Sequence, residues 1–463
     1  MTKSDHLVKG LGLFGATSVV AGTMIGTAIF VVPSLMLENA RTPSRVLLIW
    51  ALAGVLSLFG ALGYAELGAA LPEAGGEYVY LHHAYGPGMG FLYGWTQFIV
   101  AKTASIAAIA TGFLLYLAFF FPSLSAVFWR GTISAAGHRF TLALTGIQAG
   151  SAVMILLLSG INILGVRRSG AIQTLFTAAK ILVLAFLIVL GLTMGRGSWA
   201  NFESALGSPQ MAGGIFAAWG LAMISALWAY DGWNNLSMVA GEVANPQRNI
   251  PVALIAGAIL VGIVYILVNI AYFYVLTPGE AAATRTIAAE AARSFLGGAG
   301  GSFVAVGVLI STFATLNGSI LAGSRIPYAQ ARDGLFPQAL AKINERFKTP
   351  AAAIMAQAVI AGLFALSGRY ETLYTKAIYS EWIFYALVTA GIFILRRREP
   401  DLPRPYRTWG YPVVPALFVI SAVLLLAETC FTRSTDVLWC LALIGSGVPA
   451  YLLWTRRGRV KNV

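Results

Sequence analysis

Gly22-Thr23-Met24-Ile25-Gly26-Thr27 interrupts the apolar run 13–37 of this chain, and Trp228-Ala229-Tyr230-Asp231-Gly232-Trp233 interrupts a second run, 215–239. Backbone N–H and C=O groups that leave a helix at membrane depth find no water, so such a stretch persists only where it lines a cavity or lies inside the protein. Interrupted spans at corresponding places in two halves of a chain are the best sequence indicator of a transporter's substrate site. We therefore expect the two segments to border one binding site.

The composition places the chain in a membrane. Of its 463 residues, 58% are hydrophobic and 11% are charged, and the mean hydropathy is +0.77. Continuous apolar runs of about 20 residues predict transmembrane helices and exclude a barrel of alternating strands. The net charge of +13 does not predict nucleic-acid binding, because most lysines and arginines fall in short loops and tails. Charges in such places set the orientation of a membrane protein.

We predict an all-α polytopic membrane protein with one transmembrane domain, residues 1–463, and twelve helices. The predicted spans are 13–37, 45–70, 90–121, 145–164, 170–194, 213–240, 251–276, 299–325, 350–367, 374–395, 411–431 and 437–455. An even number of spans places both termini on one side of the membrane. The segments on that side hold about twice as many lysines and arginines as the opposite loops, so we expect both termini to be cytoplasmic.

The predicted spans repeat along the chain. A shift of about 205 residues brings the first five spans onto the next five and the first break onto the second. Because each repeat has an odd number of spans, the second must cross the membrane in the inverted sense. We therefore expect repeat one at about 10–195, repeat two at about 210–400, and two extra C-terminal helices at about 411–455.

The chemistry of the breaks suits a zwitterion. The exposed N-terminus of a half-helix attracts a carboxylate, and the carbonyls at the end of the other half attract an ammonium group. In the first break, Gly22 and Gly26 permit unusual backbone angles and Thr23 and Thr27 add hydroxyls. Gly22 and Gly26 also fit a G-x-x-x-G helix-packing face, which is the alternative interpretation.

The second break holds a carboxylate at membrane depth. Asp231 lies mid-span beside Gly232, and an ionisable residue there marks a functional site by default. The aromatic residues Trp228, Tyr230 and Trp233 surround it. Such rings either close over a substrate or pack against neighbouring helices.

Several motifs resemble one transporter family. The stretch Val20–Phe30 is similar to the first-helix motif of the amino acid–polyamine–organocation superfamily, and Trp228–Asn234 with Gly241–Pro246 resembles the sixth helix of its L-type amino acid transporter branch. Further matches are Tyr64-Ala65-Glu66-Leu67, Pro72-Glu73-Ala74-Gly75-Gly76-Glu77-Tyr78, Ala329-Gln330-Ala331-Arg332-Asp333-Gly334 and Arg404-Pro405-Tyr406-Arg407. The resemblance covers nearly the whole chain and implies a five-plus-five inverted-repeat fold and alternating-access transport of amino acids.

The resemblance also implies site residues. The carboxylate-binding backbone falls on Gly26, Thr27 and Ala28, with Thr23 just before, and the carbonyls that bind the amino group fall on Met24, Ile25, Trp228, Ala229 and Asp231. The gating aromatic is Trp228, with Tyr230 beside it. Ala28 replaces a glycine of the family, which narrows the site. Asp231 replaces a small residue of many eukaryotic members and either meets a cationic side chain or organises the unwound loop.

Lysines within spans bear on the coupling ion. By resemblance, Lys180 takes the place of a sodium ion of sodium-coupled relatives and ties the first broken helix to the eighth span. The hydroxyls nearest in sequence there are Ser311, Thr312 and Thr315, of which we expect Ser311 to be the partner. Lys102 is also deep, and either lines the pathway or pairs with a carboxylate. For Glu66 and Glu77, close to the cytoplasmic ends of the first repeat, we expect a solvated or capping role, and the alternative is a role as a gate or loop anchor.

These observations predict a sodium-independent amino acid transporter, an exchanger of small or medium neutral amino acids that works by alternating access. The alternatives are a proton-coupled symporter and a cationic or neutral amino acid transporter that uses Asp231. We expect no enzyme activity, cofactor, metal site or nucleic-acid partner. The loop between the third and fourth spans has no cysteine, so we expect no covalent heavy-chain partner, unlike eukaryotic relatives. The chain resembles a prokaryotic-type member, which predicts the bacterial cytoplasmic (inner) membrane.

Overall fold

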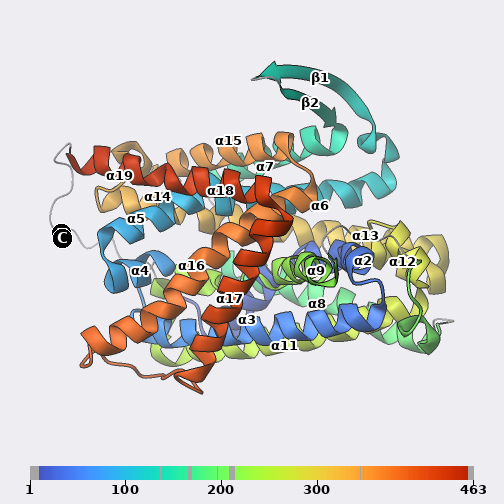
Figure 1. The fold of residues 1–463 in the computed structure, drawn as a ribbon, viewed down its shortest axis with the longest axis horizontal. Helices are drawn as coiled ribbons and strands as arrows, with labels where there is room; N and C mark the ends of the chain where they lie inside the picture. The colour runs from blue at the N-terminus through green and yellow to red at the C-terminus, as the bar shows by residue number, and fades with distance from the viewer. Residues whose placement is uncertain are drawn as a thin grey trace.

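The computed structural model describes residues 10–73, 75–135, 138–164, 169–194, 197–207, 214–344, 346–347 and 349–456. These residues fold almost entirely as helices, and the axes of most long helices are roughly aligned with one another (Figure 1). The termini 1–9 and 457–463, whose charges enter the orientation argument, lie outside the described residues.

The helices are α1 Leu13–Met24, α2 Ala28–Ala40, α3 Pro43–Ala70, α4 Glu77–Tyr85, α5 Pro87–Thr96, α6 Lys102–Phe120, α7 Gly146–Ile163, α8 Ser169–Met194, α9 Gly214–Tyr230, α10 Asn235–Met238, α11 Pro246–Val275, α12 Pro278–Ala283, α13 Ile287–Gly323, α14 Arg325–Arg332, α15 Ala351–Ser367, α16 Tyr370–Arg398, α17 Val413–Thr432, α18 Ser434–Gly445 and α19 Gly447–Arg456. A π-helical turn, η1 Gln97–Ala101, joins α5 to α6, and short 3₁₀ turns are η2 Pro122–Ser125, η3 Trp199–Phe202, η4 Ala240–Glu242 and η5 Gln338–Ala341. The strands are β1 Val127–Ala135 and β2 His138–Thr145.

The prediction of a polytopic helical membrane protein is confirmed. Among the described residues, nine continuous helical stretches are long and apolar enough to cross a membrane, and the bent pair α1–α2 adds a tenth. The other two predicted spans, 213–240 and 350–367, fall on α9 and α15, whose apolar helices are shorter. The count of twelve membrane-crossing helices therefore stays a prediction.

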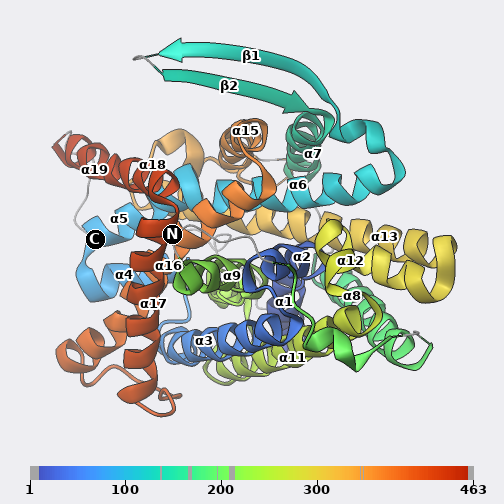
Figure 2. The ribbon, with the colours of Figure 1, turned by 45° about the vertical axis from the view of Figure 1, so that its right-hand side comes forward.

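Two connections hold more structure than the sequence suggested. The chain between α6 and α7 forms an antiparallel hairpin, β1–β2, that lies beside α7 in both ribbon views (Figure 2). The helix α13 begins at Ile287 rather than near residue 299, because the segment before Gly297 is also helical. Gly297 takes a φ of 68°, a left-handed conformation that glycine adopts without steric cost, and it bends the helix there.

The two broken helices lie in the middle of the bundle. The helix α2 packs against α9, while α1 packs against α8 and α11 (Figure 2). The helices α6 and α13 cover another side, and α16 contacts α6, α9 and α4. This arrangement encloses both unwound segments within protein, as backbone without helical partners requires.

The carboxylate of Glu66, near the end of α3, is buried with only 1% of the residue exposed. It accepts hydrogen bonds from Arg396 Nε at 2.9 Å, Arg396 Nη2 at 2.7 Å and the backbone N–H of Thr408 at 2.7 Å, and Arg404 Nε lies 3.6 Å away. The expectation of a solvated or capping role for Glu66 is wrong, because the segment after α16 folds back over the end of α3. One carboxylate thereby fixes the connection between α16 and α17.

Replacing Glu66 with Gln should destabilise the protein by about 3 kcal/mol, because it breaks a buried ion pair. We expect the low end of the usual cost because the partner, Arg396, is partly exposed. The melting temperature of the detergent-purified protein, followed by tryptophan fluorescence, measures the loss. The matched control is Glu371→Gln, which removes a more exposed pair with Arg433 and should cost about 0–1 kcal/mol. Equal melting temperatures for the two variants would contradict this role of Glu66.

Candidate functional site

The first break separates α1 from α2 at residues 25–27, and the two helices meet at an angle of 40°. Ile25 leaves the helix with φ −75° and ψ 80°, and the Gly26 N–H donates to Met24 O at 2.8 Å. The N-terminus of α2 has no side-chain cap. Its first backbone N–H groups, with the positive end of the helix dipole, are therefore suited to a carboxylate.

The second break follows α9, which ends at Tyr230. Gly232 has a φ of 113°, in the region where only glycine avoids steric strain. The chain then turns through Asn234 into the short helix α10. The predicted interruption of both spans is confirmed, but the second half of this span is only one short turn before η4.

The two breaks contact each other directly. The Thr23 hydroxyl donates to Gly232 O at 2.8 Å, and a Cβ added to Gly232 would lie 2.9 Å from the backbone carbonyl group of Thr23. The Tyr265 hydroxyl lies 2.7 Å from Met24 O and 3.0 Å from Ala229 O. A hydroxyl has one proton, so it is shared between the two carbonyls. Tyr265 on α11 therefore links the ends of α1 and α9.

A cavity of about 30 Å³ lies where the breaks meet. It has room for one or two water molecules, so an amino acid enters only if the surrounding helices move apart. Its lining residues are Thr23, Met24, Gly26, Thr27, Ala28, Lys102, Ser105, Ile109, Trp228, Asp231, Gly232, Asn235, Thr315 and Ser319.

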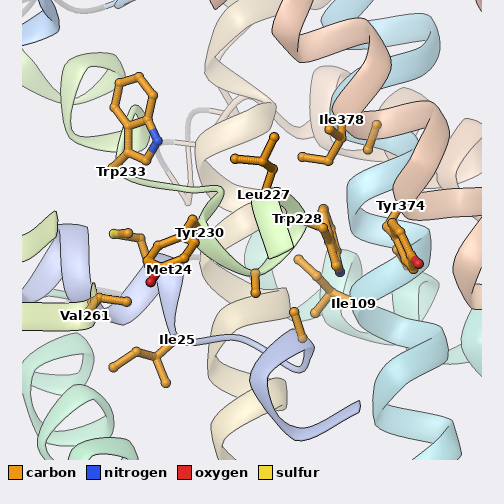
Figure 3. Packing of buried hydrophobic residues seen from close by; sticks show 14 of the residues in the cluster. Met24, Ile25, Ile109, Leu227, Trp228, Tyr230, Trp233, Val261, Tyr374 and Ile378 are labelled. Atoms are coloured by element: carbon orange, nitrogen blue, oxygen red, sulfur yellow. The ribbon is translucent and has the colours of Figure 1, made fainter. Parts of the chain in front are cut away.

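Most of the site residues expected from the sequence lie at this cavity; the ones that do not are Ile25, Ala229 and Tyr230, and the expected ion-site pair Lys180 and Ser311. Ile25 and Ala229 are fully buried behind it. Figure 3 shows Tyr230 on the opposite side of the end of α9 from Trp228, next to Met24 and Val261. The Tyr230 ring packs against Trp50 and Tyr265. The structure thus gives Tyr230 a packing position and does not bring it to the cavity as a gating residue.

Trp228 forms one wall of the cavity. Its ring lies nearly parallel to that of Tyr374, with 6.0 Å between centroids, as Figure 3 also shows. Its indole N–H donates to the Tyr370 hydroxyl at 3.0 Å, which in turn lies 3.4 Å from the Thr27 hydroxyl. Two aromatic residues of α16 and one hydroxyl of the first break therefore hold Trp228 in place.

Two charged side chains of opposite sign share the cavity. The Asp231 carboxylate accepts a hydrogen bond from the Tyr385 hydroxyl at 2.7 Å. The Lys102 ammonium group donates to Asn235 Oδ1 at 3.1 Å, and Lys102 is 3% exposed. Lys102 thus lines the cavity, and the sequence hypothesis that it lines the transport pathway stays a prediction. Its hydrogen-bond partner is an amide, not a carboxylate.

Lys180 on α8 reaches the first broken helix. Its ammonium group donates to Gly22 O at 2.8 Å and to the Thr315 hydroxyl at 2.5 Å. The expected partner, Ser311, is wrong: its hydroxyl has no hydrogen-bond partner among the described residues. The two residues are one helical turn apart on the same face of α13, and the turn that holds Thr315 is the one beside the break, where its hydroxyl lies 3.5 Å from Ile25 O.

Comparison with known proteins decides the family. The sequence profile described as "Amino acid permease" matches residues 11–448. The chain belongs to the amino acid permease family. It is 35% identical to the human b(0,+)-type amino acid transporter 1 over 98% of this chain and 89% of that protein. It is 32% identical to the serine/threonine exchanger SteT of Bacillus subtilis over 97% of this chain and 98% of that protein, and 32% identical to the mouse large neutral amino acids transporter small subunit 2 over 98% and 83%. The chain is thus an amino acid transporter of the membrane.

Some residues of this permease site were not identified from the sequence. Asn235, Ser105 and Ser319 line the cavity but lie outside the two break motifs. A signal exists for Ser105, which is three residues after Lys102, a spacing that places two residues on one helix face. Ser319 similarly follows Thr315 by four residues. Helical spacing would have found these two, whereas Asn235 follows Asp231 through the non-helical turn of the second break.

Replacing Gly232 with Ala should reduce amino acid uptake by the permease about tenfold or more. The substitution forces a strained backbone angle of order 1–3 kcal/mol and pushes against the Thr23 backbone, so it separates the two breaks. Uptake of radiolabelled amino acid into proteoliposomes measures the effect. Gly262→Ala on α11 is the control, since the nearest atom to its added Cβ is 3.9 Å away. Normal uptake by the Gly232 variant would show that the breaks tolerate separation.

Proposed function

We propose that this permease is a sodium-independent exchanger of small or medium neutral amino acids that works by alternating access. The observation that carries the proposal is the pairing of two half-helix ends at one cavity. The uncapped N-terminus of α2 offers N–H groups to a carboxylate, and the end of α9 offers carbonyls to an ammonium group. An α-amino acid carries both charges on neighbouring atoms. The backbone contacts of substrate with Gly26, Thr27 and Ala28, and with Met24, Ile25, Trp228, Ala229 and Asp231, are part of this proposal.

A neutral substrate side chain fits the charges of the cavity. Asp231 and Lys102 line it together, so their charges offset each other. The Asp231 carboxylate also accepts a hydrogen bond from the Tyr385 hydroxyl, so it already has a partner within the protein. A cationic side chain would meet Asp231 but also the Lys102 ammonium group, and this repulsion is why we place cationic substrates second. The relative named serine/threonine exchanger supports small substrates and exchange.

The walls of the cavity favour small or medium side chains. Ala28 replaces a glycine that the family pattern has, and its methyl group narrows the cavity beside the α2 N-terminus. Trp228 is held by Tyr370 and Tyr374 and fills the other wall. A large aromatic side chain requires Trp228 to leave these contacts, which costs binding free energy. Trp228 is therefore the gating residue that we propose.

Sodium independence rests on Lys180. A buried ammonium group between Gly22 O and Thr315 supplies a fixed positive charge between α1 and α13. A sodium ion at the same place would be repelled by it. When the cavity opens and α1 moves, these acceptors shift, so the ammonium group biases the conformational equilibrium as a bound cation would.

The remaining features of the proposal concern architecture and location. We propose two inverted repeats, 10–195 and 210–400, related through the two breaks, with both termini in the cytoplasm of a bacterium and the chain in its inner membrane. Eukaryotic relatives pair with a heavy chain, whereas we propose that this chain works without a covalent partner. We also propose that it catalyses no chemical reaction.

Counterflow in proteoliposomes tests the function. Vesicles loaded with unlabelled serine, alanine or leucine should take up labelled neutral amino acid many-fold faster than empty vesicles, with or without sodium, because an exchanger returns only with substrate bound. Competition with tryptophan and arginine tests the size and charge of the substrate. Equal uptake into empty vesicles would reject exchange, and a sodium requirement would reject sodium independence. Stronger competition by arginine or tryptophan than by serine would reject the preference for small or medium neutral substrates.

Replacing Thr315 with Val should slow exchange by about tenfold, because the Lys180 ammonium group loses one of its two acceptors and an unsatisfied buried charge costs 1–3 kcal/mol or more. Valine keeps the volume of threonine. The control is Ser311→Ala on the same face of α13, whose hydroxyl has no partner among the described residues and should be dispensable. Exchange rates in the counterflow assay distinguish the two variants. If Ser311→Ala is the slower protein, Lys180 has been assigned the wrong partner.

A further inference from the structure

Two buried carboxylates close to the substrate cavity, Glu77 and Glu381, play no part in the proposed mechanism. Glu77 on α4 and Glu381 on α16 are 0% and 1% exposed. Their electrostatic neighbours include Asp231 and the Lys102 ammonium group. We call Glu77, Asp231 and Glu381 the carboxylate cluster.

The cluster contains more acids than bases. Lys102 is the positive charge next to it, and among the described residues it forms no ion pair with a carboxylate. A low-dielectric interior does not hold three carboxylate charges against one ammonium charge, because each unpaired ion loses its hydration. At least one member of the cluster is therefore a neutral carboxylic acid.

Hydrogen bonds identify which member it is. Glu77 accepts from Asn234 Nδ2 at 2.7 Å and from the Tyr93 hydroxyl at 3.0 Å, and Asp231 accepts from the Tyr385 hydroxyl and from the Gly232 backbone N–H. Donors of this kind stabilise an ionised carboxylate. Within the described part of the chain, Glu381 accepts one hydrogen bond, from Gln97 Nε2 at 2.8 Å. Glu381 has the least support for a negative charge.

The Gln97 side chain gives an independent indication of a proton. Gln97 is 1% exposed, and its Oε1 atom has no hydrogen-bond partner in the described residues. The Nε2 atom of the same amide donates to the Glu381 carboxyl, so the unpaired Oε1 atom belongs to an amide group that faces Glu381. A carboxylic acid and a primary amide form two hydrogen bonds, N–H to C=O and O–H to the amide oxygen. A proton on Glu381 supplies the donor that Gln97 Oε1 lacks.

The backbone around Gln97 is arranged for this contact. Gln97 begins the π-helical turn η1, which ends directly before Lys102. π-turns inside helices are rare and occur frequently at functional sites. This turn directs Gln97 to Glu381 on α16 and Lys102 to Asn235 at the cavity. It thereby places the amide and the ammonium group beside the same cluster.

We propose that Glu381 is a proton-binding site of this protein, occupied in the closed conformation and held by Gln97. The charged and titratable groups that face it are Tyr64 from α3, Glu77 from α4, Tyr93 from α5, Lys102 from α6, Asp231 after α9 and Tyr385 on α16 itself. Between α17 and α18, Arg433 pairs with Glu371, and on α18 Asp436 pairs with Lys376. The Glu428 carboxyl of α17 lies beside Gly220 of α9 and has no hydrogen-bond partner among the described residues.

The site links protons to substrate. Asp231 belongs both to the cluster and to the cavity wall, so an amino acid that binds there changes the electrostatic potential at Glu381. By linkage, a substrate that alters the proton affinity of Glu381 has its own affinity altered by the proton to the same degree. This consequence rests on the proposed transport function, whereas the protonated state of Glu381 does not.

Infrared spectroscopy of the purified full-length protein in detergent tests the site directly. A buried protonated carboxylic acid gives a C=O stretching band above the amide region that shifts in D₂O. The wild type should show this band at neutral pH and lose it in alkali, Glu381→Gln should lack it, and Asp231→Asn should retain it. Persistence of the same band in Glu381→Gln overturns the proposal, whatever the protein transports.

A second variant guards against misfolding of the first. Gln97→Leu leaves the acid in place and removes the amide, so the band should persist and move to higher frequency as its C=O loses a hydrogen bond. An unmoved band means that Gln97 does not hold the acid, which also overturns the proposal. Glu371→Gln, far from the cluster, is the control and should leave the spectrum unchanged. Counterflow across the same pH range should depend on pH in the wild type and lose that dependence in Glu381→Gln.

Discussion

The contact between the two unwound segments is the interaction on which the site depends. The Thr23 hydroxyl and the Tyr265 hydroxyl satisfy carbonyls of both breaks, and the missing side chain of Gly232 lets the two backbones approach. Backbone groups at membrane depth that lack helical partners must be satisfied inside the protein. Once they are, each break has a fixed half-helix end to present, and the cavity follows from where the ends meet. The helices packed around them are what keep water and lipid away.

Buried charges are arranged around this contact in a consistent manner. Lys180 lies on one side of the first break and Lys102 near the second, and each ammonium group is bonded to uncharged oxygen atoms among the described residues rather than to a carboxylate. An ammonium group bonded to backbone and hydroxyl oxygens is free of the strong, fixed attraction of an ion pair. Movements of the broken helices change its surroundings at modest cost. This property suits a protein that must pass repeatedly between conformations.

The opposite arrangement holds at the end of α3. Glu66 forms a close, charged network with Arg396, and this network joins α3 to the segment after α16. Breaking it would leave a charge without a partner, so the connection stays fixed. The permease thus combines weakly held charges at its centre with a strongly held pair at its periphery. The first suits the conformational changes that we propose, and the second holds the segment after α16 against α3.

Hydropathy and interrupted apolar runs are local properties of the chain, so they were enough to predict the membrane class, most of the long helices and the position of both breaks. The sequence also indicated most of the cavity-lining residues, since the backbone of a break lines whatever cavity the break forms. Other findings needed the folded chain: Lys180 bonds Thr315 and not Ser311, Tyr230 packs away from the cavity, and Glu66 is buried. Folding also pairs Gln97 with Glu381, 284 residues apart. Such partners depend on the direction in which each side chain leaves its helix, which turns by ~100° per residue and shifts at a π-helical turn. They also depend on segments that are far apart in the chain and meet only after folding.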